Sequence, residues 1–311
     1  MTEAQPVVAR GLVKRYGDLV AVDDVDLTVE RGDVFGYLGP NGAGKTTSLR
    51  MLLGLIRPSA GRVELFGRDP LVVGARALDG VAGFVEGPAF YPYLSARRNL
   101  ELLADYDDGP RSRIDEVLEL VELRDRARDR VGGYSHGMKQ RLGIAASLLR
   151  APRLLLLDEP TTGLDPAGMR DMRELVRRLA GEGITILLSS HLLYEVEELC
   201  NRVAIVRRGR VVYEGSLAEL KAGAATSYRL RVVDVETARR VALSVAGIAD
   251  VVPSDGELQF TAGEDAVAML TVALGRAGVG FTALVPRTAS LEELFLDLTE
   301  GEQPALVEAV A

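Results

Sequence analysis

The sequence predicts an α/β protein with a large, parallel-rich sheet and a second, smaller α+β domain. Three observations support this. In the first two thirds of the chain, apolar runs alternate with helical segments. These runs end in a glycine loop or in carboxylates. The runs "RLLLLDEP" and "ITILLSSH" flank a helix expected from Met169 to Ala180, the pattern of parallel core strands joined by a crossover. Beyond about Ala225 the order of elements changes.

The first elements follow from turn signals and apolar patterning. From Val7 to Leu38 the chain has short β-rich runs separated by turns at "YGD" and "ERGD", and its last run, from Val34, enters a glycine loop. We expect a helix from Thr46 to Leu55, a turn from Pro58 to Gly61 and a strand from Arg62 to Phe66. Residues 95 to 130 are predicted to be helical, and the core sheet is expected to end near residue 215.

The second domain is predicted from the order strand, helix, strand, strand, helix, strand. These are "SYRLRVV", "TARRVALSVA", "IADVV", "ELQFT", "DAVAMLTVALGRAG" and "GFTALV", the split motif of ferredoxin-like domains. "GAATS" at 223–227 is the expected linker, and a last helix is expected from Ser290, with Glu293 at capping-box spacing. We therefore expect domains at 1–222 and 226–311.

Composition narrows the class of protein. The chain has 311 residues, of which 47% are hydrophobic and 26% charged, as in globular domains. Its single cysteine, Cys200, excludes a disulfide within the chain and a Cys-rich zinc site. A net charge of −8 argues against nucleic-acid binding, which relies on clustered Lys and Arg.

Targeting signals are not expected. The start "MTEAQPVVAR" does not have the basic and apolar regions of a signal peptide. The most apolar window, Ala266 to Val285, is interrupted by Arg276 and by turn glycines, so we expect a helix and a strand there and no membrane span. These features favour the cytoplasm.

"GPNGAGKTT" has the spacing of a phosphate-binding loop between a strand and a helix. Backbone N–H groups and the helix N-terminus would surround the phosphates, Lys45 would reach the β- and γ-phosphates, and the Thr46 hydroxyl would bind magnesium. The candidate nucleotide-binding residues of this loop are Gly39, Pro40, Asn41, Gly42, Ala43, Gly44, Lys45, Thr46 and Thr47.

Polar residues follow the two later apolar strands. Asp158 and Glu159 end the strand "LLLLDEP", at the sheet edge where ligands of open α/β folds bind. Asp158 would orient the magnesium shell, and Glu159 would polarise the attacking water. His191 ends the next strand, "LLSSH", and is a candidate contact of the γ-phosphate.

A second glycine-rich turn, "GGYSHGMKQRLG", begins at Gly132 and leads into a helix expected from Met138 onward. Such a junction can bind an anion, because the free N–H groups of a helix start point toward it. The chain thus has two candidate anion sites, although the first loop already suffices for one nucleotide.

Together these segments resemble the ATP-binding-cassette ATPases. The resemblance covers residues 7 to 215 and includes "KRYGD", Walker A "GPNGAGKTT", signature "YSHGMKQRL", Walker B "LLLLDEP", D-loop "GLDP" and the switch His191. It implies a phosphate-loop NTPase core with a parallel-rich sheet, an antiparallel β subdomain and a helical subdomain at about 87–150. The segments "LEELFLDLTEG" and "EGPAFYPYL" are similar to bacterial export ATPases of the daunorubicin and bacitracin resistance type.

The resemblance assigns further roles and partners. Tyr16 would stack on adenine, Asp165 would link two sites, and His191 would sense the γ-phosphate. Two copies would pair head to tail, so that the signature residues of one chain close over the ATP of the other. These signature residues are Ser135, His136, Gly137 and Met138. The implied cofactors are ATP and Mg²⁺, and the implied second partner is an integral membrane permease.

This chain departs from the family pattern at two places. The usual signature "LSGGQ" is "YSHGM" here, with His136 and Met138 where Gly and Gln are usual. The glutamine that normally links the metal to the membrane partner is Glu86, in "FVEGP". A carboxylate there can bind metal or water but repels phosphate, so Glu86 is a further candidate metal ligand; the alternative is a solvent-facing loop residue.

The sequence thus predicts the ATP-hydrolysing subunit of a drug or antibiotic exporter, peripheral to the cytoplasmic face of the membrane. One alternative is a soluble cassette ATPase that acts on nucleic acid or in translation, which the acidic balance and single cassette disfavour. Another is a regulatory ATP switch with negligible turnover, which the presence of both Glu159 and His191 disfavours. The residues beyond 226 are expected to support dimerisation or regulation.

Overall fold

The computed structural model of the chain describes residues 4–106, 111–222, 227–254, 256–287 and 291–300. It divides the chain into two compact units, Met1–Leu217 and Ala218–Ala311, so the division falls a few residues before the expected boundary at 222. Residues 223–226 of the expected linker at 223–227 and the expected helix start at Ser290 lie outside the described residues, and Ser227 already belongs to the first strand of the second unit.

A six-stranded sheet forms the centre of the first unit. Its order is β5-β6-β7-β3-β8-β9, with the first five strands parallel and β9 antiparallel to β8. The strands are β3 (Val34–Leu38), β5 (Val81–Phe84), β6 (Leu154–Asp158), β7 (Thr185–Ser190), β8 (Arg202–Arg207) and β9 (Arg210–Ser216). β6 and β7 are buried along their whole length, because helices and a second sheet cover the two faces.

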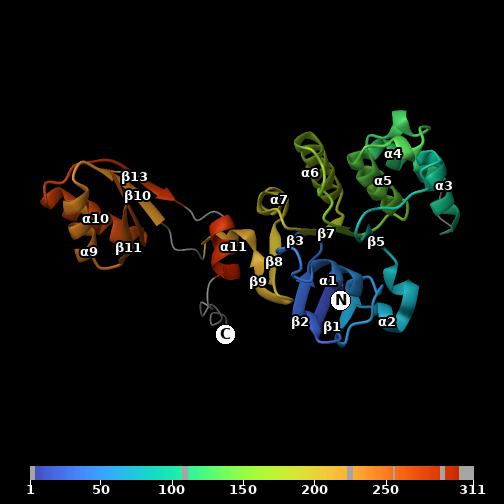
Figure 1. The fold of residues 1–311 in the computed structure, drawn as a ribbon, viewed down its shortest axis with the longest axis horizontal. Coiled ribbons are helices and arrows are strands. Elements are labelled where there is room, and N and C mark those ends of the chain that lie inside the picture. Colours follow the sequence, from blue (N-terminus) through green and yellow to red (C-terminus); the bar gives the residue numbers. More distant parts are fainter. Residues whose placement is uncertain (1–3, 107–110, 223–226, 255, 288–290, 301–311) are drawn as a thin grey trace. The chain divides into compact units, whose positions relative to one another are not determined.

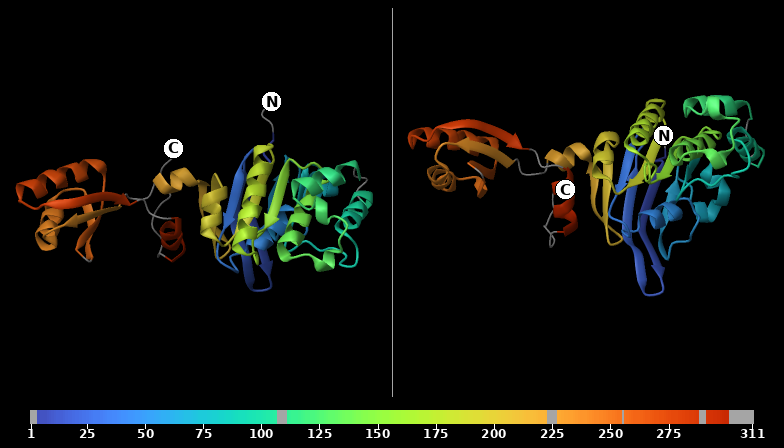
Figure 2. Two further views of the ribbon diagram at one scale, coloured as in Figure 1. Left: turned by 90° about the horizontal axis from the view of Figure 1, so that it is seen from above. Right: turned by 45° about the horizontal axis from the view of Figure 1, so that its top comes forward.

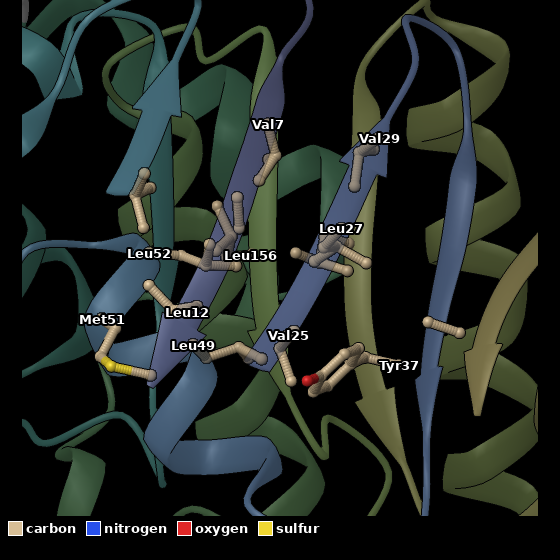
Figure 3. Close-up of a cluster of buried hydrophobic side chains, with 14 of the residues drawn as sticks. Val7, Leu12, Val25, Leu27, Val29, Tyr37, Leu49, Met51, Leu52 and Leu156 are labelled. Carbon is tan, nitrogen blue, oxygen red and sulfur yellow. The ribbon is translucent and has the colours of Figure 1, made fainter. Parts of the chain in front are cut away.

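A smaller antiparallel sheet, of order β2-β1-β4, packs against the central one. It comprises β1 (Val7–Tyr16), β2 (Leu19–Val29) and β4 (Ala60–Leu65). Helix α1 (Lys45–Leu52) lies between the two sheets, and Figure 3 shows Leu49 and Leu52 among side chains of both. This shared apolar core fixes α1, and with it the glycine loop that precedes the helix.

Tyr37 connects the central strand β3 to α1 inside this core. Its ring is almost fully buried, and its hydroxyl lies 3.1 Å from Ser48 Oγ on α1. Burial raises the pKa of Tyr37 to about 12, so the phenol stays neutral and can share a hydrogen bond with Ser48.

The remaining helices of the first unit lie outside the two sheets. In Figure 1, α6 and α7 lie on one side of the central sheet, and α1 lies on the other. These helices are α2 (Pro70–Val73), α3 (Ala96–Tyr106), α4 (Ile114–Leu120), α5 (His136–Leu148), α6 (Pro166–Gly181) and α7 (Leu193–Leu199). A further helix, α8 (Leu217–Ala222), begins at the last residue of this unit.

The expectation that residues 95 to 130 are helical is correct for only parts of this range. α3 ends at Tyr106, α4 covers only Ile114–Leu120, and the rest of the described chain up to 130 holds only short 3₁₀ turns at Arg111–Arg113 and Arg124–Arg126. The segment "DDGP" at 107–110 lies outside the described residues. Glu122, just after α4, has a positive φ of 58°, which residues in a right-handed helix do not adopt. Amphipathic patterning on both sides concealed this second break.

The expected first helix also ends early. α1 stops at Leu52, three residues before the predicted end at Leu55. Gly54, with φ of 67°, follows, and its N–H donates to the carbonyl of Met51 at 3.0 Å. This is how a glycine commonly closes a helix.

The second unit has the predicted β-α-β-β-α-β order and a four-stranded antiparallel sheet of order β11-β12-β10-β13. Figure 2 shows this sheet with its helices. The sheet and the helices share an apolar core that includes Leu230, Phe260 and Leu270. The expected ferredoxin-like arrangement is therefore confirmed. Its elements are β10 (Ser227–Val232), α9 (Val235–Ser244), β11 (Ile248–Ser254), β12 (Glu257–Ala262), α10 (Glu264–Arg276) and β13 (Phe281–Arg287), followed by α11 (Leu291–Glu300).

Candidate active site

The glycine loop connects β3 to α1 with no room for side chains at two positions. A Cβ on Gly39 would lie 2.5 Å from the carbonyl oxygen of Val206, and one on Gly44 would lie 2.4 Å from that of Ala21. Gly44 also has φ of 100°, which L side chains rarely adopt. Tight packing against neighbouring backbone thus holds the loop in a fixed shape at the start of α1.

The N-terminus of α1 is open to an anion. Among the described residues no side chain caps it, and its first turn, "KTTS", contains no acidic residue. The free N–H groups and the helix dipole therefore present partial positive charge beside the loop. This is the arrangement that binds phosphate.

Lys45, the first residue of α1, is buried and spans from the loop to the edge of the sheet. Its Nζ donates to the carbonyl oxygens of Gly39 at 2.8 Å and Pro40 at 3.2 Å. The same Nζ lies 3.2 Å from Glu159 Oε1. A single cation therefore joins the phosphate loop to the carboxylate after β6.

Asp158, the last residue of β6, is buried, and both of its carboxylate oxygens accept hydrogen bonds. Ser189 Oγ, on neighbouring β7, donates to Oδ1 at 2.5 Å, and the backbone N–H of Glu86 donates to Oδ2 at 3.2 Å. These contacts fix the carboxylate at the carboxyl end of the sheet.

Glu159 is held by three side chains and by an unusual backbone conformation. His191 Nδ1 donates to Oε2 at 2.9 Å, Thr162 Oγ1 donates to the same oxygen at 2.9 Å, and Lys45 faces Oε1. Its φ of 47° lies in the left-handed region, which is uncommon for residues other than glycine. Strained backbone of this kind concentrates at functional sites.

The surroundings of Glu159 also set its charge. Partial burial raises the pKa of Glu159, but the hydroxyl of Thr162, the ammonium of Lys45 and His191 lower it, and the resulting pKa lies below its usual value. The carboxylate is therefore ionised at neutral pH. It can accept a hydrogen bond from a water molecule, and it becomes a stronger base if Lys45 moves away.

A cavity of about 520 Å³ opens beside the loop. Tyr16 lines it and is half exposed, with the ammonium of Lys14 5.0 Å from its ring centroid. The cavity is lined by Tyr16, Leu19, Val20, Ala21, Asn41, Gly42, Gly44, Lys45, Thr46, Thr47, Glu159 and Arg208. The structure thus brings the expected aromatic residue, the phosphate loop and Glu159 around one space.

Among the residues of this region that sequence reasoning missed, Arg208 and Glu195 are the charged ones. Arg208 lines the cavity from the β8–β9 turn, where only the dipeptide "RR" before a glycine could have indicated it. Glu195, on α7, is buried, and its Oε2 accepts from Thr161 Oγ1 at 2.7 Å and Ser190 Oγ at 3.0 Å. Glu195 therefore joins the segment after Glu159 to the residue before His191.

The signature residues lie outside this cavity. Ser135 caps α5 and accepts a hydrogen bond from the N–H of Met138 at 3.2 Å, so the helix begins at His136 rather than at Met138. Gly137 and Met138 belong to the first turn of α5, and none of the four residues lines the cavity. The first anion site is thus formed without the second glycine turn.

Asp165 and Glu86 have other contacts in this single chain. Asp165 caps α6, where its Oδ1 accepts from the N–H of Gly168 at 2.8 Å. The carboxylate of Glu86 forms an ion pair with Arg50 and is largely exposed, so its backbone, not its side chain, touches Asp158. Glu86 also has a positive φ, of 69°.

The donor set fits magnesium only together with a phosphate ligand. Within the described residues, no group of three or more His, Cys, Asp or Glu side chains could hold a metal ion. Magnesium is commonly held by one or two carboxylates together with substrate phosphates, and Thr46 and Asp158 beside the loop provide oxygen donors of this kind.

Comparison with known proteins identifies the family. Residues 22–162 match the family model described as ABC transporter. The chain is 47% identical over 212 residues to the bacitracin transport ATP-binding protein BcrA of Bacillus licheniformis, covering 68% of this chain and 69% of that protein. It is 40% identical to the daunorubicin resistance ATP-binding protein DrrA3 of Streptomyces coeruleorubidus, covering 96% of each.

A solved structure agrees with this result. A dimeric ATP-binding cassette in a post-hydrolysis state, bound to ADP and phosphate, is 25% identical, with a TM-score of 0.61 over 68% of this chain and 98% of that one. The chain belongs to the ATP-binding proteins of ABC transporters. The predicted family and fold class are thereby confirmed. Among the described residues, the helices do not combine the length and apolar character needed to cross a bilayer.

Proposed function

We propose that this chain binds and hydrolyses ATP to power an exporter of drugs or antibiotics. The observation that carries the proposal is the contact of Lys45 and His191 with opposite oxygens of Glu159 beside the phosphate loop. The similarity to proteins of bacitracin transport and daunorubicin resistance supports the export of such compounds.

ATP would occupy the cavity with its adenine on Tyr16 and its phosphates at the loop and the start of α1. The loop contacts would come from residues 39–47, with Thr46 and Asp158 as magnesium ligands. When bound, magnesium neutralises charge on the phosphates. Lys45 would move from Glu159 to the β- and γ-phosphates, because an ammonium forms short, strong, charge-assisted hydrogen bonds to phosphate oxygens.

Departure of Lys45 would leave Glu159 held by Thr162 and His191. Its pKa would rise, because partial burial continues to disfavour the charge while one cation has gone. The carboxylate would then orient the attacking water and accept its proton more readily. The Nε2 atom of His191 would face the γ-phosphate, while Nδ1 stays bound to Glu159.

A second copy of the chain and a membrane permease would complete the transporter. In the proposed head-to-tail pair, residues Ser135 to Met138 of one chain would contact the ATP of the other through the Ser135 hydroxyl and the backbone N–H groups, and Asp165 would join the two sites. An apolar groove of about 400 Å³, between β5 and helices α3 and α5, offers a docking surface for the permease. The chain would lie at the cytoplasmic face of the membrane.

Two other functions have less support. Binding to nucleic acid would require a basic surface, whereas the net charge is −8. A switch without turnover would not need a carboxylate and a histidine in contact beside the phosphate loop.

The first prediction separates binding from hydrolysis. Glu159→Gln should keep ATP affinity but reduce hydrolysis by at least about tenfold, because it removes the base and water-orienting group. Lys45→Ala is the matched variant, and it should weaken ATP affinity itself because it removes the phosphate contact. Titration with a fluorescent ATP analogue and phosphate release measure the two properties. Near-normal turnover of Glu159→Gln would dismiss this carboxylate as the base.

The second prediction concerns Glu86. If its side chain turns from Arg50 to the metal or its water when ATP binds, Glu86→Gln should shift the magnesium dependence of hydrolysis or its stimulation by the permease. Arg50→Gln is the control, because it frees Glu86 without removing it. Superimposable magnesium titrations and equal stimulation would leave Glu86 as a surface loop residue.

The third prediction concerns the second unit, which we propose supports dimerisation or regulation. A chain that ends near Gly223 should keep ATP affinity, since the described cavity-lining residues precede that point. It should dimerise more weakly with ATP, which sedimentation at several concentrations would measure. Equal dimerisation and equal turnover in both chains would exclude this role.

A further inference from the structure

The chain after Glu159 folds into a tight turn that includes Thr162. The N–H of Thr162 donates to the carbonyl of Glu159 at 3.1 Å, and the N–H of Leu164 donates to that of Thr161 at 3.1 Å. Gly163, with φ of 77°, allows the turn to close. Because Thr162 Oγ1 also donates to Glu159 Oε2, the position of this turn contributes to the orientation of the carboxylate, together with Lys45 and His191.

The signature residue His136 reaches the same turn from the start of α5. Its Nε2 lies 3.0 Å from the carbonyl oxygen of Thr162. A carbonyl only accepts hydrogen bonds, so Nε2 is the donor in this contact, while Gln140 Nε2 lies farther from the same atom, at 3.4 Å. The ring also lies against the turn, since a Cβ on Gly163 would come within 3.4 Å of its Cδ2.

A second contact supports the first. A Cβ built on Gly137 would lie 3.5 Å from Cδ2 of Leu164, so the backbone of the signature turn also packs on this segment. A glycine at position 136, as in the usual signature, would have no side chain to make the hydrogen bond. The hydrogen bond to the Thr162 carbonyl therefore depends on the histidine that this chain has at position 136.

We propose that His136 is a positioning residue that couples the signature turn to the hydrolysis site of its own chain. The path runs from His136 through the carbonyl of Thr162 and its hydroxyl to Glu159. This rests on the proposed function, in which the signature turn closes on the ATP of the partner chain. Closure would hold the Thr162 turn in place, and engagement of the signature turn would thereby fix the orientation of Glu159 for hydrolysis.

A double-mutant cycle tests this path. His136→Ala should lower kcat by roughly three- to tenfold, the effect of one hydrogen bond, and leave KM for ATP unchanged. Thr162→Val should lower kcat to a similar extent. The double variant should be no slower than Thr162→Val, because both substitutions interrupt one path. His136 is exposed, so its replacement leaves the core intact.

Two conservative variants serve as controls. His136→Gln retains an N–H donor and should recover most of the lost kcat, and Thr162→Ser retains the hydroxyl and should lose less kcat than Thr162→Val. In the Glu159→Gln background, His136→Ala should form the ATP-dependent dimer as well as the parent does. Weaker dimerisation would show that His136 acts on the partner's ATP directly, which would overturn the proposal.

The remaining outcomes separate this inference from the proposed function. If the two kcat losses multiply in the double variant, or if His136→Ala hydrolyses normally while Glu159→Gln does not, the coupling path is wrong but the ATPase stands. The proposed function itself fails if, in the presence of the permease, the wild-type chain does not hydrolyse ATP. It also fails if Glu159→Gln does not remove the hydrolysis.

Discussion

The described site depends on one carboxylate that several parts of the chain hold at once. Glu159 accepts hydrogen bonds from Thr162 and His191 and faces Lys45, and its own N–H donates to Ser189 Oγ at 3.0 Å. A partly buried carboxylate is costly unless it is paired, so these contacts stabilise both its charge and its strained φ. The phosphate loop and the two strand ends are thereby held around a common point.

The register of the central sheet makes these contacts possible. β7 lies between β6 and β3, with Asp158 opposite Ser189 and Leu38 opposite Ser190. The three strands therefore end at the same level, and the N–H of Gly39 donates to the carbonyl of Ser190 at 3.3 Å. Residues that immediately follow these strands must meet at one edge, as ligand sites of open α/β sheets do. A shift of one strand by one residue would separate Glu159 from His191.

Much of this arrangement could be predicted from the sequence, because it depends on local patterns. The glycine spacing of the phosphate loop, the buried strands and the polar residues directly after them indicated which side chains would gather at the sheet edge. The fold class of both units followed from the order of elements. The biochemical roles of the gathered residues stay predictions.

Other features depend on contacts between segments that are far apart in the sequence, and such contacts cannot be read from a single sequence. The backbone of Glu86 has a positive φ, and this loop conformation decides whether its carboxylate faces the metal site or Arg50. The buried Glu195 and the cavity-lining Arg208 have no motif around them. In each case tertiary packing, not local propensity, decided the outcome.

The central claim is that a hydrolysis site is completed by two chains, and cross-linking tests it most directly. Cysteines would replace Asn41, which is exposed at the phosphate loop, and Ser135, in a chain with Cys200→Ser and Glu159→Gln. A disulfide needs Cα atoms within about 7 Å. We predict that oxidation gives a covalent dimer only with ATP and magnesium. A disulfide within single chains at high dilution, or equal cross-linking without ATP, would contradict the account.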